Sequence, residues 1–172
     1  MKPNISAIVA VTIDGKIARH AGHFTDWTSP EDKTFLRSLL DKSDAVVIGN
    51  NTYKTAAGPL SKRNCVVFTR AVRDTERRSD NLVYYNADGL TPIAAILEPY
   101  RTVALLGGTQ VYSYFLERNL IDDLYLTIEP VVFGSGLDIF KCENEVTTDF
   151  HFVAVKELNE KGTVLLHYQR PS

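Results

Sequence analysis

The chain has 172 residues, of which 44% are hydrophobic and 23% charged, and its formal net charge at pH 7 is −2. This length predicts one domain with room for a sizeable core, and the composition excludes intrinsic disorder, a collagen-like chain and a coiled coil. The near-neutral charge argues against a protein dedicated to nucleic acids or membrane surfaces, because such binders usually carry a basic excess.

The cysteines and the first apolar run indicate the cellular compartment of the protein. Cys65 and Cys142 lie far apart without the spacing of metal ligands, so the sequence indicates neither a metal site nor a disulfide framework. The first apolar run is too short for a signal peptide, and no run reaches transmembrane length. We therefore expect a cytoplasmic protein, monomeric or homodimeric, with no membrane or nucleic-acid partner.

The first part of the chain predicts buried strands that alternate with helices. Residues 5–11 are a compact apolar run that ends in a turn, which is typical of a buried strand, whereas residues 16–28 are polar and irregular. Ser29 and Pro30 predict a helix start, with Ser29 as the N-cap and Pro30 at the first helical position. Further strands are predicted at residues 44–49, 64–69, 82–85 and 101–106.

The order of the elements predicts the fold class. Strands that alternate with helices pair in parallel, and residues 107–109 open another helix. After that helix the pattern changes to a β-rich run at 123–132 and a hairpin of residues 150–156 and 163–169. We expect an α/β fold whose sheet is parallel first and antiparallel last. The Arg-rich residues 70–78 are interpreted as a solvated loop.

Ligands of such sheets bind beyond the carboxyl ends of the strands, where the sequence places residues 14–29, 49–52 and 107–109. Gly107 and Gly108 end a strand and begin a helix, so free backbone N–H groups and absent side chains would admit a phosphate. The alternative is a packing requirement at a tight turn. Residues 49–52 offer a second helix start, which is equally well interpreted as an N-cap and turn.

Asp32 has two interpretations. It follows Ser29 by three residues, which is the spacing of a capping box. It is also framed by Trp27 and Leu36, whose apolar groups would raise the pKa of a carboxylate at a cleft edge. The spacing alone leaves the helix cap and the functional carboxylate equally open.

The segment from Trp27 to Asp32 resembles the Trp-x-x-Pro-x-Asp/Glu signature of dihydrofolate reductases, in which the carboxylate grips the pterin ring. The resemblance covers nearly the whole chain. It includes residues 5–10, 47–53, 59–63, 67–70, 106–112 and 124–127. It implies a single domain over residues 1–172, with a three-layer fold built on a mixed, mainly parallel sheet and a C-terminal antiparallel hairpin. It also implies NADPH-dependent reduction of 7,8-dihydrofolate to tetrahydrofolate.

The resemblance implies roles for individual residues as well. Asp32 would orient the pterin with a supporting hydrogen bond from Thr127, and Arg63 would bind the carboxylate tail of folate unless it is a plain surface arginine. The implied catalytic residues are Trp27, Asp32, Tyr112 and Thr127. The implied substrate-binding residues are Val9, Ala10, Asp32, Leu36, Leu60, Arg63 and Leu106. NADPH would contact Ala10, Ile17, Asn51, Thr52, Thr69, Arg70, Gly107, Gly108, Thr109, Gln110 and Val111.

Other stretches are closer to the reductase domain of riboflavin-biosynthesis deaminase-reductases, which shares the fold and NADPH and reduces a ribosylaminopyrimidine phosphate. These stretches are residues 14–18, 43–46, 119–124 and 130–134. That domain usually carries an Asp-Asp/Asn-Pro-x-Leu segment for the substrate phosphate, and residues 54–60 lack it. Its absence, with Asp32 and Arg63 present, favours folate. The alternatives are this pyrimidine reductase and a non-catalytic NADPH-binding protein.

The chain also departs from the dihydrofolate reductase pattern. Asn50 and Asn51 stand where basic residues usually help to bind the 2′-phosphate, so Arg70 would carry more of that recognition. Lys33 replaces a usual apolar residue after the key carboxylate, which changes the expected shape of the pterin pocket. The loop at residues 19–26 is longer than in bacterial members, and a mobile polar loop of this kind suits a lid.

Overall fold

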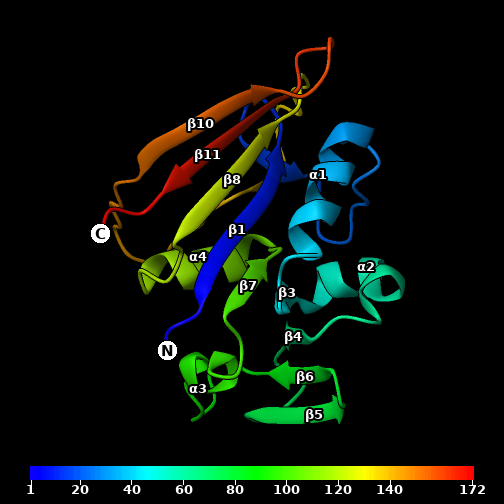
Figure 1. The fold of residues 1–172 in the computed structure, drawn as a ribbon. Coiled ribbons are helices and arrows are strands. Elements are labelled where there is room, and N and C mark those ends of the chain that lie inside the picture. Colours follow the sequence, from blue (N-terminus) through cyan, green and yellow to red (C-terminus); the bar gives the residue numbers. More distant parts are fainter.

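The computed structural model describes residues 1–172 as one large sheet with helices on both faces (Figure 1). The helices are α1 (Pro30–Leu40), α2 (Asn50–Leu60), α3 (Ile93–Leu97) and α4 (Thr109–Glu117). The strands are β1 (Asn4–Val11), β2 (Lys16–Ala18), β3 (Ala45–Gly49), β4 (Cys65–Phe68), β5 (Thr75–Ser79), β6 (Leu82–Tyr85), β7 (Thr102–Leu105), β8 (Asp123–Ile128), β9 (Leu137–Asp138), β10 (His151–Glu157) and β11 (Val164–Gln169). None of the helices has the length and apolarity needed to cross a bilayer.

The main sheet is mixed and mainly parallel. Its nine strands follow the order β10-β11-β8-β1-β7-β3-β4-β6-β5. The central pairings of β1, β7, β3, β4 and β6 are parallel, and β8 is also parallel to β1. The hairpin of β10 and β11 adds antiparallel strands beside β8. The expected α/β class and C-terminal hairpin are therefore confirmed.

The core has two halves, one on each face of the sheet. Alternate side chains of β1 separate the halves, because Ala7 packs with α3 and α4 whereas Ile8 packs with α1 and α2. Figure 1 shows the same division, with α1 and α2 on one side of the sheet and α3 and α4 on the other. This is the three-layer arrangement that the resemblance implied.

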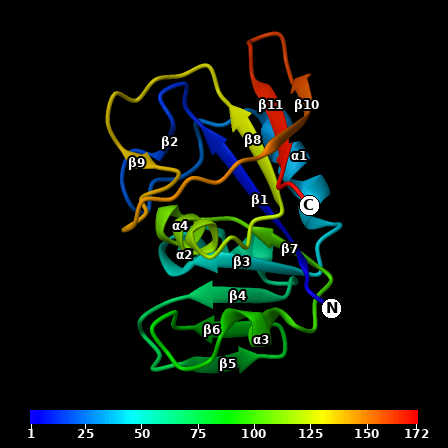
Figure 2. The same ribbon diagram turned by 90° about the vertical axis from the view of Figure 1, so that its left-hand side faces the viewer.

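Three of the sequence expectations need correction. Residues 75–79 form β5 rather than a loop, and they pair antiparallel with β6 at the sheet edge. Every side chain of β5 is exposed, so no hydrophobic pattern marks it. Residues 16–18 form β2, which pairs with the two-residue β9 away from the main sheet (Figure 2). The run at 123–132 stays in the sheet only as far as Ile128, because Pro130 cannot continue the ladder.

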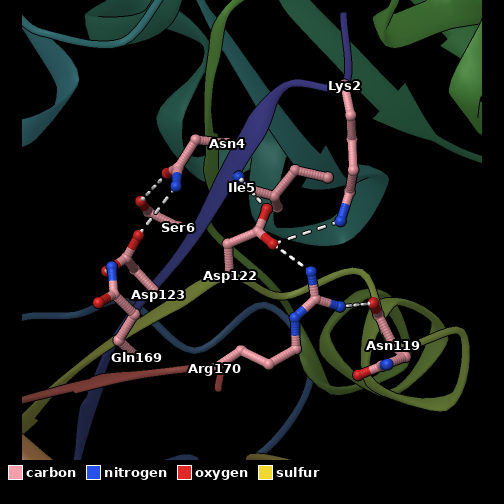
Figure 3. A network of polar contacts seen from close by, with 9 residues as sticks. All are labelled: Lys2, Asn4, Ile5, Ser6, Asn119, Asp122, Asp123, Gln169 and Arg170. Atoms are coloured by element: carbon pink, nitrogen blue, oxygen red, sulfur yellow. Dashed lines mark hydrogen bonds and ion pairs between the residues drawn. The ribbon is translucent and has the colours of Figure 1, made fainter. Parts of the chain in front are cut away.

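A polar network holds the amino ends of β1 and β8 together (Figure 3). The carboxylate of Asp122 accepts from the backbone N–H of Ile5 at 3.0 Å and pairs with Lys2 and Arg170. The partners of the neighbouring buried Asp123 are Asn4, His167 and Gln169. The network lies at the amino ends of the parallel strands. The candidate site lies at their carboxyl ends, at the opposite end of the sheet.

Candidate active site

The carboxyl ends of β3 and β7 bring two helix starts together. The backbone N–H of Gly49 donates to the carbonyl oxygen of Gly107 at 2.6 Å, so the loops before α2 and α4 touch. Both helices begin at a glycine N-cap, Gly49 or Gly108, without a side-chain cap and without an acidic residue in the first turn. Their first N–H groups and positive dipole ends are therefore available to an anion.

Asp32 lies in the first turn of α1 and is only 8% exposed. Ser29 is the N-cap as predicted, since its Oγ accepts from the backbone N–H of Asp32 at 3.2 Å. A full capping box would return a bond from the backbone N–H of Ser29 to the Asp32 carboxylate. That N–H instead donates to Oε1 of Glu129 at 2.7 Å. The carboxylate of Asp32 is therefore not used to cap the helix.

Burial is the main influence on Asp32 and raises the pKa of its carboxyl above the ordinary value. Hydrogen bonding by Thr127 acts in the opposite direction, the negative charge of Glu129 raises the pKa further, and Lys33 lowers it. Thr127 is itself buried on β8, opposite Ala10 of β1. The structure thus brings together Asp32 and Thr127, the pair that the resemblance implied.

Tyr112 is fully buried beside Asp32. Its hydroxyl donates to the carbonyl oxygen of Ile8 at 2.7 Å. Burial, with the nearby charge of Asp32, raises the pKa of Tyr112. The hydroxyl therefore anchors α4 to β1, and any contact of this residue with a ligand would come from its ring.

Trp27 offers an unpaired donor. Its ring packs edge-to-face on Phe133, with the ring centroids 5.1 Å apart. The indole Nε1 is buried and has no hydrogen-bond partner in the protein. Buried donors are normally satisfied, so this N–H is a candidate contact for a ligand or for an ordered water molecule.

The two glycines before α4 have different reasons for lacking a side chain. Gly107 has φ +85°, and a Cβ there would lie 2.5 Å from a ring carbon of Tyr112, so packing excludes a side chain. At Gly108 the nearest atom to an added Cβ is Oγ1 of Thr52 at 3.6 Å, which leaves room. The packing interpretation therefore holds for Gly107, whereas the space at Gly108 remains open to a ligand.

The other residues predicted for the cofactor lie in the first turns of these helices, on β2 or just after β4. Asn51 and Gln110 are exposed, Thr52 and Thr109 are half-buried, and Val111 is buried in the core. Beyond β4, Thr69 is half-buried, and Arg70 has a side chain that is 83% exposed and pairs with Asp88 at 3.4 Å. Ile17 of β2 packs on the edge of the core.

The residues predicted for the substrate lie on both faces of β1. Val9 is buried on the side of α4, and Ala10 is half-buried next to Thr127. Leu36, Leu60 and Leu106 all belong to the core half under α1 and α2. Leu60 is 3% exposed, whereas Leu36 and Leu106 are only partly buried.

A family model described as dihydrofolate reductase matches residues 4–163. The chain belongs to the dihydrofolate reductase family. The "Uncharacterized protein YwjB" of Bacillus subtilis (strain 168) is 28% identical over 178 residues, covering 94% of this chain and 95% of that protein.

Two solved structures share the fold of this family member. A putative riboflavin biosynthesis protein from Shewanella sp. PV-4 superposes with a TM-score of 0.78 at 23% identity, and the match covers 100% of both chains. A dihydrofolate reductase from Enterococcus faecalis complexed with NADP(H) superposes with a TM-score of 0.72 at 21% identity, covering 98% of this chain and 97% of that one. At these identities the likeness concerns the fold.

In this member of the dihydrofolate reductase family, Arg63 lies at the far end of α1 from Asp32. Its guanidinium donates to the carbonyl oxygen of Leu40 at 2.7 Å and to the carboxylate of Asp41 at 2.6 Å. Leu40 is eight residues after Asp32, which corresponds to about 12 Å along the helix axis. Part of the donor set that was assigned to a substrate carboxylate therefore binds the end of α1.

The loop after β1 is fastened to the segment after β8. Asp14 accepts from Oγ1 of Thr12 at 2.6 Å and from the backbone N–H groups of Phe133 at 3.2 Å and Gly134 at 2.8 Å. The hydrogen bond from Thr12, together with these backbone bonds, lowers the pKa of Asp14 to about 2 although desolvation opposes the shift. Lys16 of β2 adds an ion pair with Asp138 of β9 at 2.5 Å.

Two residues near the site escaped the sequence analysis. Phe133 packs on Trp27, and the guanidinium of Arg19 lies over the Phe133 ring, 4.1 Å from the ring centroid. Glu129 is 3% exposed at the end of β8, behind Asp32. A charged residue inside the β-rich run predicted at 123–132 was the available signal for Glu129, whereas Phe133 was marked only by its place in the 130–134 resemblance.

Proposed function

We propose that the chain is an NADPH-dependent reductase, with 7,8-dihydrofolate as the substrate that its residues fit best. The observation that carries the proposal is the buried carboxylate of Asp32, which is not used as a helix cap and lies next to Thr127. Dihydropterin presents a ring N–H beside an exocyclic amine. A carboxylate accepts both hydrogen bonds at a fixed geometry, so Asp32 would orient the ring.

Other residues complete the proposed pterin site. The unpaired Nε1 of Trp27 would donate to a polar atom of the substrate, directly or through water. Leu36 and Leu106, which are partly buried in the core half under α1 and α2, would contact the ring. The substrate nitrogen must gain a proton during reduction, and we assign this proton to a water molecule held at Asp32.

The cofactor residues fit a dinucleotide phosphate. The uncapped starts of α2 and α4 and the space at Gly108 would hold its phosphates, and Arg70 with Thr69 would reach the 2′-phosphate. Bound there, the nicotinamide group would supply the hydride. Positioning of the two rings would then supply much of the rate.

A ribosylaminopyrimidine phosphate is the second candidate substrate. Arg63 favours it, because two of its donors already bind the end of α1 and are less available to a folate tail. The full-length likeness to a putative riboflavin biosynthesis protein is compatible with it. A protein that binds NADPH without turnover is the remaining possibility.

The test is the loss of NADPH absorbance with dihydrofolate and, separately, with 5-amino-6-(5-phosphoribosylamino)uracil. We expect turnover of dihydrofolate, and Asp32→Asn should lower kcat/KM by about 100-fold or more because the ring loses its orientation. Glu31→Gln removes a charge from the exposed neighbouring position and is the matched control. Turnover of the pyrimidine alone would select the second candidate, and NADPH binding without either activity would select the binding protein.

The variant Arg63→Ala tests whether Arg63 binds the carboxylate tail of folate. If Arg63 holds the folate tail, the variant should raise KM for dihydrofolate but not for a pteridine that lacks the tail. Equal losses for both would place Arg63 in the support of α1 alone.

A further inference from the structure

Glu129 is a buried carboxylate that no proposed step has used. It lies where β8 ends and is 3% exposed. Its Oε1 accepts from the backbone N–H of Ser29 at 2.7 Å, and its Oε2 accepts from Oγ1 of Thr163 at 2.7 Å. Thr163 is in turn held by Asn159 in the turn between β10 and β11. One carboxylate thus joins α1, β8 and the C-terminal hairpin.

Ser29 connects Glu129 to Asp32. Its N–H donates to Glu129, while its Oγ caps the N–H of Asp32 at 3.2 Å. A shift of the Glu129 side chain would therefore move the start of α1 and with it the Asp32 carboxylate. Residues locked in this way supply the rigid support that an orienting group needs.

Glu129 is the buried acid among the groups that act on Asp32, whereas Glu31 is next to Asp32 in the chain but exposed. Lys33 lies on the same helix, Tyr112 lies on α4, and Glu129 lies at the end of β8. The negative charge of Glu129 disfavours the charged form of Asp32 and so raises the pKa of Asp32.

We propose that Glu129 is a positioning residue of the candidate site, which fixes the start of α1 and acts on the Asp32 carboxylate through its negative charge. The catalytic part of this inference rests on the proposed function. Its electrostatic part can be measured in the protein alone. The negative charge of Glu129 keeps Asp32 protonated to higher pH than burial alone would.

The test follows the titration of the Asp32 carboxyl carbon by NMR in the protein without ligands, with the signal assigned from Asp32→Asn. In Glu129→Gln the amide oxygen can still accept a hydrogen bond, but the charge is gone. The titration midpoint of Asp32 should therefore move to lower pH. Glu31→Gln removes an exposed charge next to Asp32 and keeps an oxygen that can accept from Asn159. This variant and Thr163→Val, which keeps the Glu129 charge, should leave the midpoint near its wild-type position.

A purely structural Glu129 predicts a different pattern. Thr163→Val and Glu129→Gln would then both lower Tm, and neither would move the Asp32 midpoint. That result would overturn the proposal. Should Glu129→Gln fail to fold, Glu129→Met, which removes the charge with a side chain of similar size, takes its place in the same titration.

The kinetic readout separates this inference from the proposed function. If dihydrofolate is turned over, the limb of the pH profile of kcat/KM that depends on Asp32 should move to lower pH in Glu129→Gln. If neither substrate is turned over, the proposed function fails, and the NMR titration still supports or refutes the coupling of Glu129 to Asp32.

Discussion

At the scale of single residues, side chains with similar sequence signals have different physical roles. Ser29 and Asp32 have the spacing of a capping box, yet only the serine caps α1, because Glu129 takes the N–H that the carboxylate would have bound. Glu129 lies 100 residues after Ser29 in the sequence. Local spacing identified Asp32 as a candidate but carried no information about this competing partner.

The glycine pair before α4 provides a prediction at this scale. Gly107→Ala should destabilise the fold by about 1–3 kcal/mol, because the new Cβ would meet the Tyr112 ring at a positive φ. Gly108→Ala should change stability by less than about 1 kcal/mol, since its surroundings are open. If the cofactor phosphates bind there, Gly108→Ala should still weaken NADPH binding about 10-fold or more.

Thermal unfolding and fluorescence titration with NADPH check both variants. The stable Gly108→Ala protein is the informative one, because lost affinity cannot then be attributed to lost structure. Unchanged affinity in that variant would remove Gly108 from the cofactor site.

At the scale of elements, the sequence predicted those strands and helices that bury an apolar pattern. β1, β3, β4 and β7 are of this kind, and each was predicted with its boundaries close to those observed. Strand β5 was missed because all its side chains are exposed, and the short β2 and β9 because their pairing depends on partners more than 100 residues apart. Exposed and long-range pairings leave no periodic signal.

The hydrogen bonds between Asp14, in the loop after β1, and residues 133–134 give a prediction at the scale of elements. The pKa of Asp14 is lowered to about 2, so its ionised form stabilises the contact with residues 133–134. For a lowered carboxyl pKa this stabilisation is complete above the ordinary value and is lost as the pH falls towards about 2. Asp14→Asn should therefore loosen the loop at neutral pH and differ less from wild type as the pH falls below 4.

Trp27 is the only tryptophan and packs on Phe133, so its fluorescence reports on this contact directly. The emission of Asp14→Asn should differ from that of wild type at pH 7, and the difference should shrink in acid. Asp26→Asn is a suitable control, because Asp26 is exposed in the segment after β2 and makes no bond to residues 133–134. A pH-independent difference would show that the charge of Asp14 is not what fastens the loop.

At the scale of the whole molecule, the two edges of the nine-stranded sheet have opposite character. At one edge, β5 carries Glu76, Arg77 and Arg78 and no large apolar side chain. Strand β10 forms the other edge (Figure 1). Its Phe152 is 59% exposed and its Val155 is 58% exposed. Charged edges discourage pairing with other chains, and apolar edges permit it.

We therefore expect Val155→Lys to reduce association at high protein concentration while changing stability by no more than about 0.5 kcal/mol, because the side chain is largely exposed. Light scattering over a concentration series measures the association, and thermal unfolding measures the stability. Thr75→Lys introduces the same residue on the β5 edge and should leave the scattering unchanged. The edge of β10 has no part in association if Val155→Lys scatters as strongly as wild type, or if Thr75→Lys has the same effect.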